Sequence, residues 1–175
     1  MSLSSEGTPN LVAFERLVEE YGDRVYGIAL RITGSPADAE DAMQDAFLSA
    51  FRSWPEFRFE SSPTTWLYRI AVNAALQRVR GRPVAEHSVE DEDAPIRDWS
   101  VDVPQVAMRS ELYAEIERQI RQLPSDLAVA LVLRDVEGLS TAETAAVLDL
   151  SEASVKSRLH RARSLLRRSL QDYLS

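Results

Sequence analysis

The amino-acid sequence predicts an all-α fold of two small helical domains. Apolar residues recur at steps of three and four through residues 10–80 and again through 106–175, which is the period of helices with one buried face. No stretch alternates apolar and polar residues for long enough to predict a strand. Residues 81–105 have no such period and contain three prolines and seven acidic residues. We interpret them as a flexible acidic linker.

Three helices are expected in residues 10–80, after a disordered N-terminus at 1–9. The apolar face of the first helix ends at Gly34-Ser35-Pro36, a sequence that stops helices. The second helix ends at Trp54-Pro55, and its acidic first turns suit the positive end of the helix dipole. Ser62-Pro63 then gives the cap-then-proline order that opens a third helix.

The second domain, residues 106–175, is also expected to be helical. An apolar stripe that starts at Leu112 predicts one helix, and Pro124-Ser125 opens another that continues through Val136. Gly138 follows where a C-terminal cap belongs.

Residues 139–168 have the layout of a helix-turn-helix DNA reader, in which the second helix enters the major groove. Ser140 and Glu143 form an S-x-x-E capping box for the first helix, and Ser151 is a plausible cap for the second. From Ser151 onward the chain has six basic and two acidic residues, although its net charge is −8. The alternative is a solvated helix whose arginines only provide solubility. The short capped helix before it favours DNA binding.

Composition argues against several other functions. The chain has no cysteine, so disulfides and thiolate metal sites are excluded, and His87 and His160 lie far apart in the sequence. We expect no metal, no cofactor and no enzyme activity, because there is no phosphate loop, nucleophile elbow or metal-ligand pattern. A polar N-terminus and the lack of a long apolar run predict a cytoplasmic protein.

Two segments carry a resemblance to a known family. AEDAMQDAFLSAFRSWPEFRFESSPTTWLYRIAVNAALQRVR (residues 39–80) and LPSDLAVALVLRDVEGLSTAETAAVLDLSEASVKSRLHRARSLLRR (residues 123–168) resemble, in the right order, conserved parts of the bacterial σ70 family, of the extracytoplasmic-function (ECF) type. The resemblance implies an alternative sigma factor, a dissociable subunit that gives RNA polymerase its promoter specificity. The first domain would bind polymerase and open the −10 promoter element, and the second would read the −35 element.

The resemblance also implies three sets of site residues. The second helix would bind the β′ coiled coil of core polymerase through carboxylates beside an apolar edge: Asp38, Asp41, Gln44, Asp45, Leu48 and Phe51. The third helix and the loop before it would bind and melt the −10 element, with aromatic side chains for unstacked bases: Phe57, Phe59, Ser61, Thr64, Thr65, Tyr68, Arg69, Asn73, Gln77, Arg78 and Arg80. The last long helix would bind the −35 element: Ser151, Glu152, Ser154, Lys156, Ser157, Arg158, His160, Arg161 and Arg163.

Three single positions add expectations of their own. Trp66 is expected in the core rather than on a base. Thr64 stands where the family often has a basic residue. Asp149 occupies a turn position where glycine is common, and Asp tolerates the unusual backbone angles of such a turn better than most residues.

The expected partners are core RNA polymerase (its β′ and β subunits), promoter DNA and an anti-sigma factor. The main alternative is a sigma-like mimic that titrates an anti-sigma factor without initiating transcription. A helix-turn-helix repressor with an N-terminal sensor is less favoured, and an enzyme is least favoured. The acidic linker has two interpretations, a nucleic-acid mimic inside polymerase channels or plain disorder. A further hypothesis is that it attracts the basic last helix in the free protein and masks DNA binding.

Overall fold

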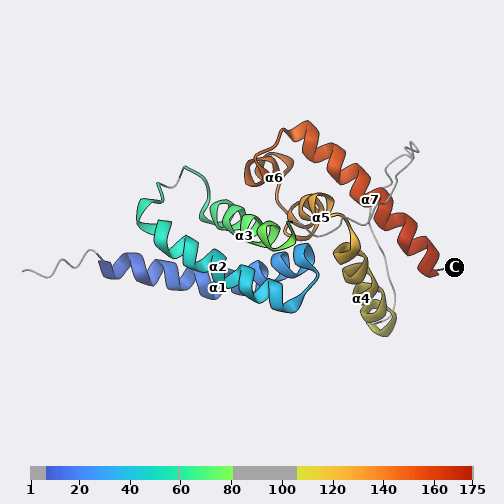
Figure 1. Ribbon diagram of the computed structural model, residues 1–175, viewed down its shortest axis with the longest axis horizontal. Helices are drawn as coiled ribbons and strands as arrows, with labels where there is room; N and C mark the ends of the chain where they lie inside the picture. Colours follow the sequence, from blue (N-terminus) through green and yellow to red (C-terminus); the bar gives the residue numbers. More distant parts are fainter. Residues whose placement is uncertain (1–6, 59, 81–105, 175) are drawn as a thin grey trace, which may run out of the picture.

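The computed structural model describes residues 7–58, 60–80 and 106–174, and within these ranges it contains helices, turns and short loops but no strand (Figure 1). The all-α prediction is therefore confirmed for the described residues. The expected linker, 81–105, and residues 1–6 lie outside them. The first helix begins at Gly7, so the last residues of the expected disordered N-terminus are helical.

Three helices form the first unit, which we call the N-terminal body: α1 (Gly7–Thr33), α2 (Pro36–Ser53) and α3 (Pro63–Val79), with a 3₁₀ turn at Trp54–Glu56 after α2. Serine side chains cap two of them, because Ser35 accepts a hydrogen bond from the Asp38 amide and Ser62 from the Thr65 amide. Each of these helices then begins at a proline, which the sequence analysis predicted for α3, whereas it assigned Pro36 to the stop of the first helix. Gly34 has a φ of 69°, the left-handed conformation that ends α1.

The C-terminal body contains α4 (Val106–Gln122), α5 (Ser125–Leu131), α6 (Thr141–Leu148) and α7 (Glu152–Leu174). The helix expected to continue through Val136 changes character before its end, since Val132–Val136 form a π-helical turn. The Glu137 amide accordingly donates to the Val132 carbonyl, five residues back. A π turn widens the helix and shifts the residues that follow it. Gly138 then takes a φ of 76°.

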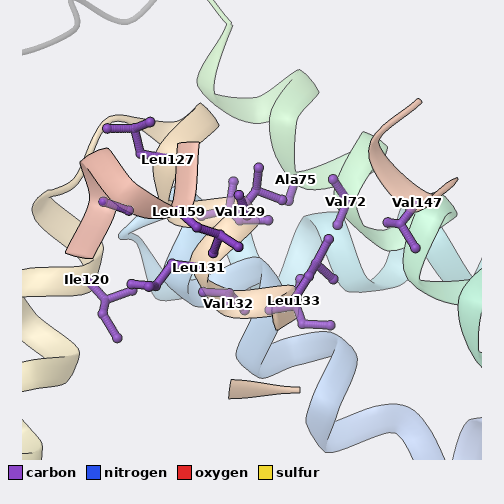
Figure 2. Close-up of a cluster of buried hydrophobic side chains, with 14 of the residues drawn as sticks. Val72, Ala75, Ile120, Leu127, Val129, Leu131, Val132, Leu133, Val147 and Leu159 are labelled. Atoms are coloured by element: carbon purple, nitrogen blue, oxygen red, sulfur yellow. The ribbon is translucent and has the colours of Figure 1, made fainter. Parts of the chain in front are cut away.

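The two bodies share a hydrophobic core. One cluster of buried side chains lies within the N-terminal body, around Phe14, Val25 and Leu67. A larger cluster crosses between the bodies: Val72 and Ala75 of α3 lie close to Val129 and Leu133 of α5 and its π turn (Figure 2). In the ribbon, α5 sits beside α1 and α3, and α6 lies over α3 (Figure 1). The sequence predicts two domains but gives no sign that they pack together.

Candidate DNA and protein interfaces

The helix-turn-helix forms from local hydrogen bonds. Both halves of the predicted capping box are present, with the Glu143 amide 3.1 Å from the Ser140 hydroxyl and the Ser140 amide 2.7 Å from the Glu143 carboxylate. The hydrogen bond from the Ser140 amide, and after it one from the Ser140 side chain, lowers the pKa of the Glu143 carboxyl below its ordinary value. Asp149 makes the turn at a φ of 54°, in the left-handed region, and the Ser151 hydroxyl accepts from the Ser154 amide to cap α7.

The predicted −35 residues lie off the buried stripe of α7, at its N-terminal cap and along its first three turns. Val155, Leu159 and Ala162 are buried against α5 and α6, as their spacing predicts. Most predicted DNA contacts are exposed, and three are half-buried. The exposed ones are Ser151, Glu152, Ser154, Lys156, Ser157 and Arg161, and the half-buried ones are Arg158, His160 and Arg163.

Arg163 has a partner within the protein. Its Nε and a terminal nitrogen donate to the two carboxylate oxygens of Asp135 at 2.9 and 2.7 Å. This bidentate pair raises the pKa of Arg163 above its ordinary value and ties α7 to the π turn. The sequence predicts Arg163 as a DNA contact, whereas the pair indicates a structural function as well.

The predicted polymerase surface of α2 combines acid and exposed apolar groups. Leu48 and Phe51 are 55% and 51% exposed, although large apolar side chains of this kind are usually buried. Asp41, Gln44 and Asp45 are exposed on the same helix, and Asp38 is half-buried in its first turn. Charged groups beside an apolar edge suit a basic, amphipathic partner.

Arg78 connects this surface to the predicted −10 residues. Its guanidinium donates to Asp41 at 3.2 Å and also pairs with Asp45, and the hydrogen bond with Asp45 is the main cause that raises its pKa. The arginine comes from α3 and the two carboxylates from α2. One side chain predicted to bind DNA is therefore held by two side chains predicted to bind polymerase.

The other predicted −10 residues fall into three groups. Some are exposed: Ser61, Arg69, Asn73, Gln77 and Arg80. Phe57 and Thr64 are half-buried, and the Thr64 hydroxyl donates to the Tyr21 hydroxyl at 3.0 Å. Thr65 and Tyr68 are buried, and Phe59 lies outside the described residues.

Aromatic rings gather where the loop before α3 meets α1 and α2. Phe57 stacks on Trp54 with ring centroids 5.7 Å apart, and Trp66 lies 4.8 Å from Phe57. Phe14 of α1 also contacts Trp54, with ring centroids 5.7 Å apart. Trp66 is half-buried and packs against the N-terminal core, which agrees with its expected place in the core.

Tyr68 makes a polar contact between the two bodies that the sequence does not predict. Its hydroxyl donates to a carboxylate oxygen of Glu137 at 2.8 Å, and only 1% of the residue is exposed. Burial raises the pKa of Tyr68 well above its ordinary value, and the hydrogen bond to the Glu137 carboxylate adds to the effect. The sequence offers no signal for Glu137, because the two residues are 69 positions apart.

Two further polar contacts join the bodies. Arg31 of α1 donates to both carboxylate oxygens of Glu117 in α4, at 2.6 and 2.9 Å. The guanidinium of Arg69 donates to the Ala146 carbonyl in α6. Arg31 and Glu117 are missing from the predicted site residues, since neither stands in a motif.

Comparison with known proteins identifies the family. Sigma-70 region 2 matches residues 17–83, and the family described as Sigma-70, region 4, matches residues 113–166. Together these matches cover more than half of the chain. The chain belongs to the sigma-70 family. The resemblance inferred from the two quoted segments is thus confirmed.

Named sigma-70 relatives match over nearly the whole chain. RNA polymerase sigma-H factor of Pseudomonas aeruginosa is 38% identical over 170 residues, covering 93% of this chain and 88% of the relative. ECF RNA polymerase sigma-E factor of Escherichia coli is 36% identical over 167 residues, covering 91% and 87%. These relatives support the ECF type.

Solved structures show the same fold. CnrH, in complex with the cytosolic domain of CnrY, matches with a TM-score of 0.67 and 28% identity, covering 94% of this chain and 91% of that one. The sigma factor RpoE of Bartonella quintana, in complex with the anti-sigma factor NepR, matches with a TM-score of 0.66 and 23% identity, covering 91% and 97%. The second likeness concerns the fold alone.

Two negative findings hold for the described residues. No group of three or more histidine, aspartate or glutamate side chains in these ranges lies together in a way that could hold a metal ion. Among the described helices, none has the length and apolar character needed to cross a lipid bilayer.

Proposed function

We propose that this sigma-70 family member is an alternative sigma factor of the ECF type, which binds core RNA polymerase and directs initiation at a specific set of promoters. One observation carries the proposal: a capped helix-turn-helix and an acidic helix with exposed Leu48 and Phe51 occur on one chain. A DNA-binding repressor needs the first feature but not the second. Such a protein acts by binding, without catalytic residues, metal or cofactor of its own.

The two bodies would bind different parts of the polymerase–promoter complex. Residues 10–80 would bind polymerase and the −10 element, and residues 106–175 would bind the −35 element. The intervening 25 residues can reach at most about 80–90 Å when fully extended, so they can connect two sites far apart on one complex.

On α2, the partner would be a basic amphipathic helix, which we assign to the β′ coiled coil of core polymerase. Leu48 and Phe51 would supply the apolar contact, and burial of two such side chains contributes roughly 1.5–3 kcal/mol each. Asp41, Gln44 and Asp45 would orient the partner by electrostatic complementarity, which affects association rate and register more than affinity.

On α3, the exposed polar side chains would contact the −10 element. Asn73 and Gln77 can hydrogen-bond base edges, and Arg80 can bind phosphate. Phe57 is half-buried in the aromatic cluster and offers a surface on which an unstacked base could lie.

On α7, the first turns would enter the major groove at the −35 element. Glu152 can accept from a cytosine amino group, and Lys156 and Arg161 can donate to guanine or to phosphates. Because the net charge of the chain is −8, this helix is not expected to bind DNA tightly alone. Core polymerase would hold α7 beside the −35 element.

An anti-sigma factor is the third expected partner. CnrH and the Bartonella RpoE were both solved as complexes, the latter with an anti-sigma factor. We place this chain in the cytoplasm, because bacterial polymerase and promoters are there.

Run-off transcription tests the proposal. Core polymerase and the purified chain are incubated with a library of bacterial promoters, and transcripts are sequenced. Selective initiation, lost on Leu48→Asp and retained on Glu20→Gln, is the expected result. Polymerase binding without any initiation would instead indicate a mimic, and DNA binding without polymerase affinity would indicate a repressor.

A further inference from the structure

We propose that Asp135 and Arg163 are positioning residues for −35 recognition, and that their bidentate pair sets the angle at which the first turns of α7 meet the DNA. Asp135 lies in the π turn, outside the helix-turn-helix, and is not among the expected site residues. The proposal rests on the proposed function and adds the residues that orient its recognition helix. It also gives Arg163 a function other than the DNA contact that the sequence predicts.

The apolar contacts of α7 fix its buried side better than its angle. Val155, Leu159 and Ala162 are each at most 4% exposed and hold α7 in the core of the C-terminal body. Apolar attraction depends on the area removed from water and has no preferred direction. The stripe therefore determines which side of α7 is buried more firmly than it determines the exact tilt of the helix.

The pair of Asp135 and Arg163 is a directional contact beside that stripe. Nε and a terminal nitrogen of Arg163 donate to the two carboxylate oxygens at 2.9 and 2.7 Å. Two parallel hydrogen bonds between planar groups restrict orientation as well as distance. Both side chains are 32% exposed, so water competes with the pair, and its effect is on geometry more than on stability.

A rigid segment presents the carboxylate to α7. Asp135 lies in the π turn, and Val132 and Leu133 of the same turn are 0% exposed in the shared core. A π turn departs from the regular helical path, and such turns are frequent at functional sites. Asp135 is thus a fixed point against which α7 can be oriented.

The length of α7 amplifies any change at the pair. Glu152 begins the helix, roughly 16 Å along the axis from Arg163, so a rotation of about 10° at the pair moves the first turn by roughly 3 Å. Hydrogen bonds to base edges are lost over such a shift, because donor and acceptor must lie within about 3.2 Å. Phosphate contacts from a long, flexible side chain such as Lys156 tolerate it better. Sequence discrimination should therefore suffer more than general DNA affinity.

The charge of Arg163 also argues against a DNA contact of its own. Asp135 matches that charge, so the pair adds no net charge to a surface that would face phosphates. Arg161 on the same helix is exposed. The two arginines thus offer a matched comparison, in which Arg161 acts on DNA and Arg163 on the orientation of α7.

Asp135→Asn distinguishes positioning from direct contact, because the two functions predict opposite signs. Core polymerase with the chain is titrated against the duplex that gives the strongest run-off transcript, and against the same duplex with its −35 element scrambled. We expect binding of the intact duplex to weaken by about fivefold or more, as for the loss of a base contact, with little change for the scrambled one. If Arg163 touched DNA, loss of its carboxylate partner would free it and tighten binding, and that result would overturn the proposal. Asp126→Asn, at an exposed position of α5, controls for the lost negative charge.

Arg163 variants add a readout that a loss of stability does not move. Arg163→Gln should lower discrimination between the two duplexes and leave the slope of log affinity against log salt unchanged, whereas Arg161→Gln should reduce that slope by about one. Arg163→Lys keeps the charge but not the two parallel hydrogen bonds, so it should resemble Arg163→Gln. Full discrimination by the lysine variant, or a reduced slope in Arg163→Gln, would contradict positioning.

A double variant tests whether the two residues act through one contact. Asp135→Asn combined with Arg163→Gln should lose no more discrimination than either single variant, because each change removes the same pair. Losses that add would show that the two residues act separately, which the proposal does not allow.

Spin labels test the orientation of α7 without DNA or polymerase. The chain has no cysteine, so Glu111→Cys in α4 and Glu152→Cys in α7 give two exposed and unique labelling sites. We expect Asp135→Asn to shift or broaden the distance between the labels and Asp126→Asn to leave it unchanged. An unchanged distance in Asp135→Asn, with normal initiation by the unaltered chain, would overturn positioning and leave the proposed function intact. A shifted distance together with no initiation at any promoter would overturn the proposed function, while the pair would still orient α7.

Discussion

The guanidinium of Arg78 lies 3.2 Å from the carboxylate of Asp41, and this contact joins the predicted −10 surface on α3 to the predicted polymerase surface on α2. Asp45 holds the same guanidinium from the next turn of α2. All three side chains are at least one-third exposed, so water competes with these pairs and they can be exchanged for other partners. A basic side chain of polymerase that binds the two carboxylates would release Arg78 for DNA.

The first prediction follows from this exchange. Asp41→Asn with Asp45→Asn should tighten binding of a single-stranded −10 oligonucleotide to the chain by threefold to tenfold, because Arg78 becomes free to bind phosphate. Fluorescence anisotropy at low salt measures the affinity. In an Arg78→Gln background the same double change should have much less effect, and Glu40→Gln controls for the loss of one exposed negative charge. An equal gain in the Arg78→Gln background would contradict the coupling.

A second prediction separates two arginines of α7. Arg161 is exposed, so Arg161→Ala should weaken −35 binding by the polymerase complex and reduce the slope of log affinity against log salt by about one if the contact is to phosphate. Arg163 is paired with Asp135, so Arg163→Ala should lower the free energy of unfolding by about 1 kcal/mol. Binding titrations and urea unfolding measure the two effects. Equal losses of stability for both variants would contradict the distinction.

Asp149 gives a prediction about the turn of the helix-turn-helix. Its φ of 54° strains any residue with a Cβ, and glycine has no such penalty. Asp149→Gly should therefore raise the free energy of unfolding by roughly 0.5–1 kcal/mol. Urea unfolding monitored by circular dichroism tests this, with Asp126→Gly, in a right-handed helical turn, expected to destabilise. A loss of stability in Asp149→Gly would show that the aspartate side chain contributes more than the strain removes.

The buried hydroxyl of Thr144 gives a fourth prediction. The residue is 0% exposed, and its Oγ1 has no hydrogen-bond partner among the described residues. A buried polar group without a partner costs about 1–3 kcal/mol, and valine has nearly the same shape. Thr144→Val should thus leave stability unchanged or raise it, whereas Thr144→Ser should lower it. A clear loss of stability in the valine variant would indicate that the hydroxyl has a partner after all.

Glu143 predicts a dependence of stability on pH. Hydrogen bonds from the Ser140 amide and side chain lower its pKa below 4.5 in the folded protein. Its contribution is therefore complete well above the ordinary pKa of 4.5 and is lost as the pH falls through the lowered value. The difference in melting temperature between the chain and Glu143→Gln should be constant above about pH 5.5 and shrink below pH 4.5. A difference that stays constant down to pH 3 would contradict a role for the ionised carboxylate.

Local rules explain why much of the helix-turn-helix was predictable. Ser140, Glu143 and Ser151 act through hydrogen bonds to amides three residues away, so the residues and their spacing suffice to predict the caps. The buried stripe of α7, including Val155 and Leu159, follows equally from its helical period. Which exposed side chains bind DNA or polymerase remains a prediction, because exposure alone does not name a ligand.

The π turn at Val132–Val136 was not predictable from the sequence. Three of its five residues are apolar and none is a proline or a glycine, so the sequence suits an ordinary helix, and the turn adopts its wider form where α5 packs against the rest of the core. The π turn affects the contact between the bodies, because Glu137 comes directly after the turn and accepts a hydrogen bond from the Tyr68 hydroxyl. The sequence analysis assigned Tyr68 to DNA binding, and in the structure its hydroxyl donates to Glu137 between the two bodies.

The sequence by itself determined the helices, their caps, the left-handed turn at Asp149 and the sigma-70 family, because each depends on residues close together in the chain or on segments that keep their order. Only the tertiary structure decided that the two bodies pack together. Arg31 and Glu117 are 86 residues apart, and Tyr68 and Glu137 are 69 apart. Such pairs form only when two whole surfaces are complementary in shape and charge, and no local spacing encodes that fit.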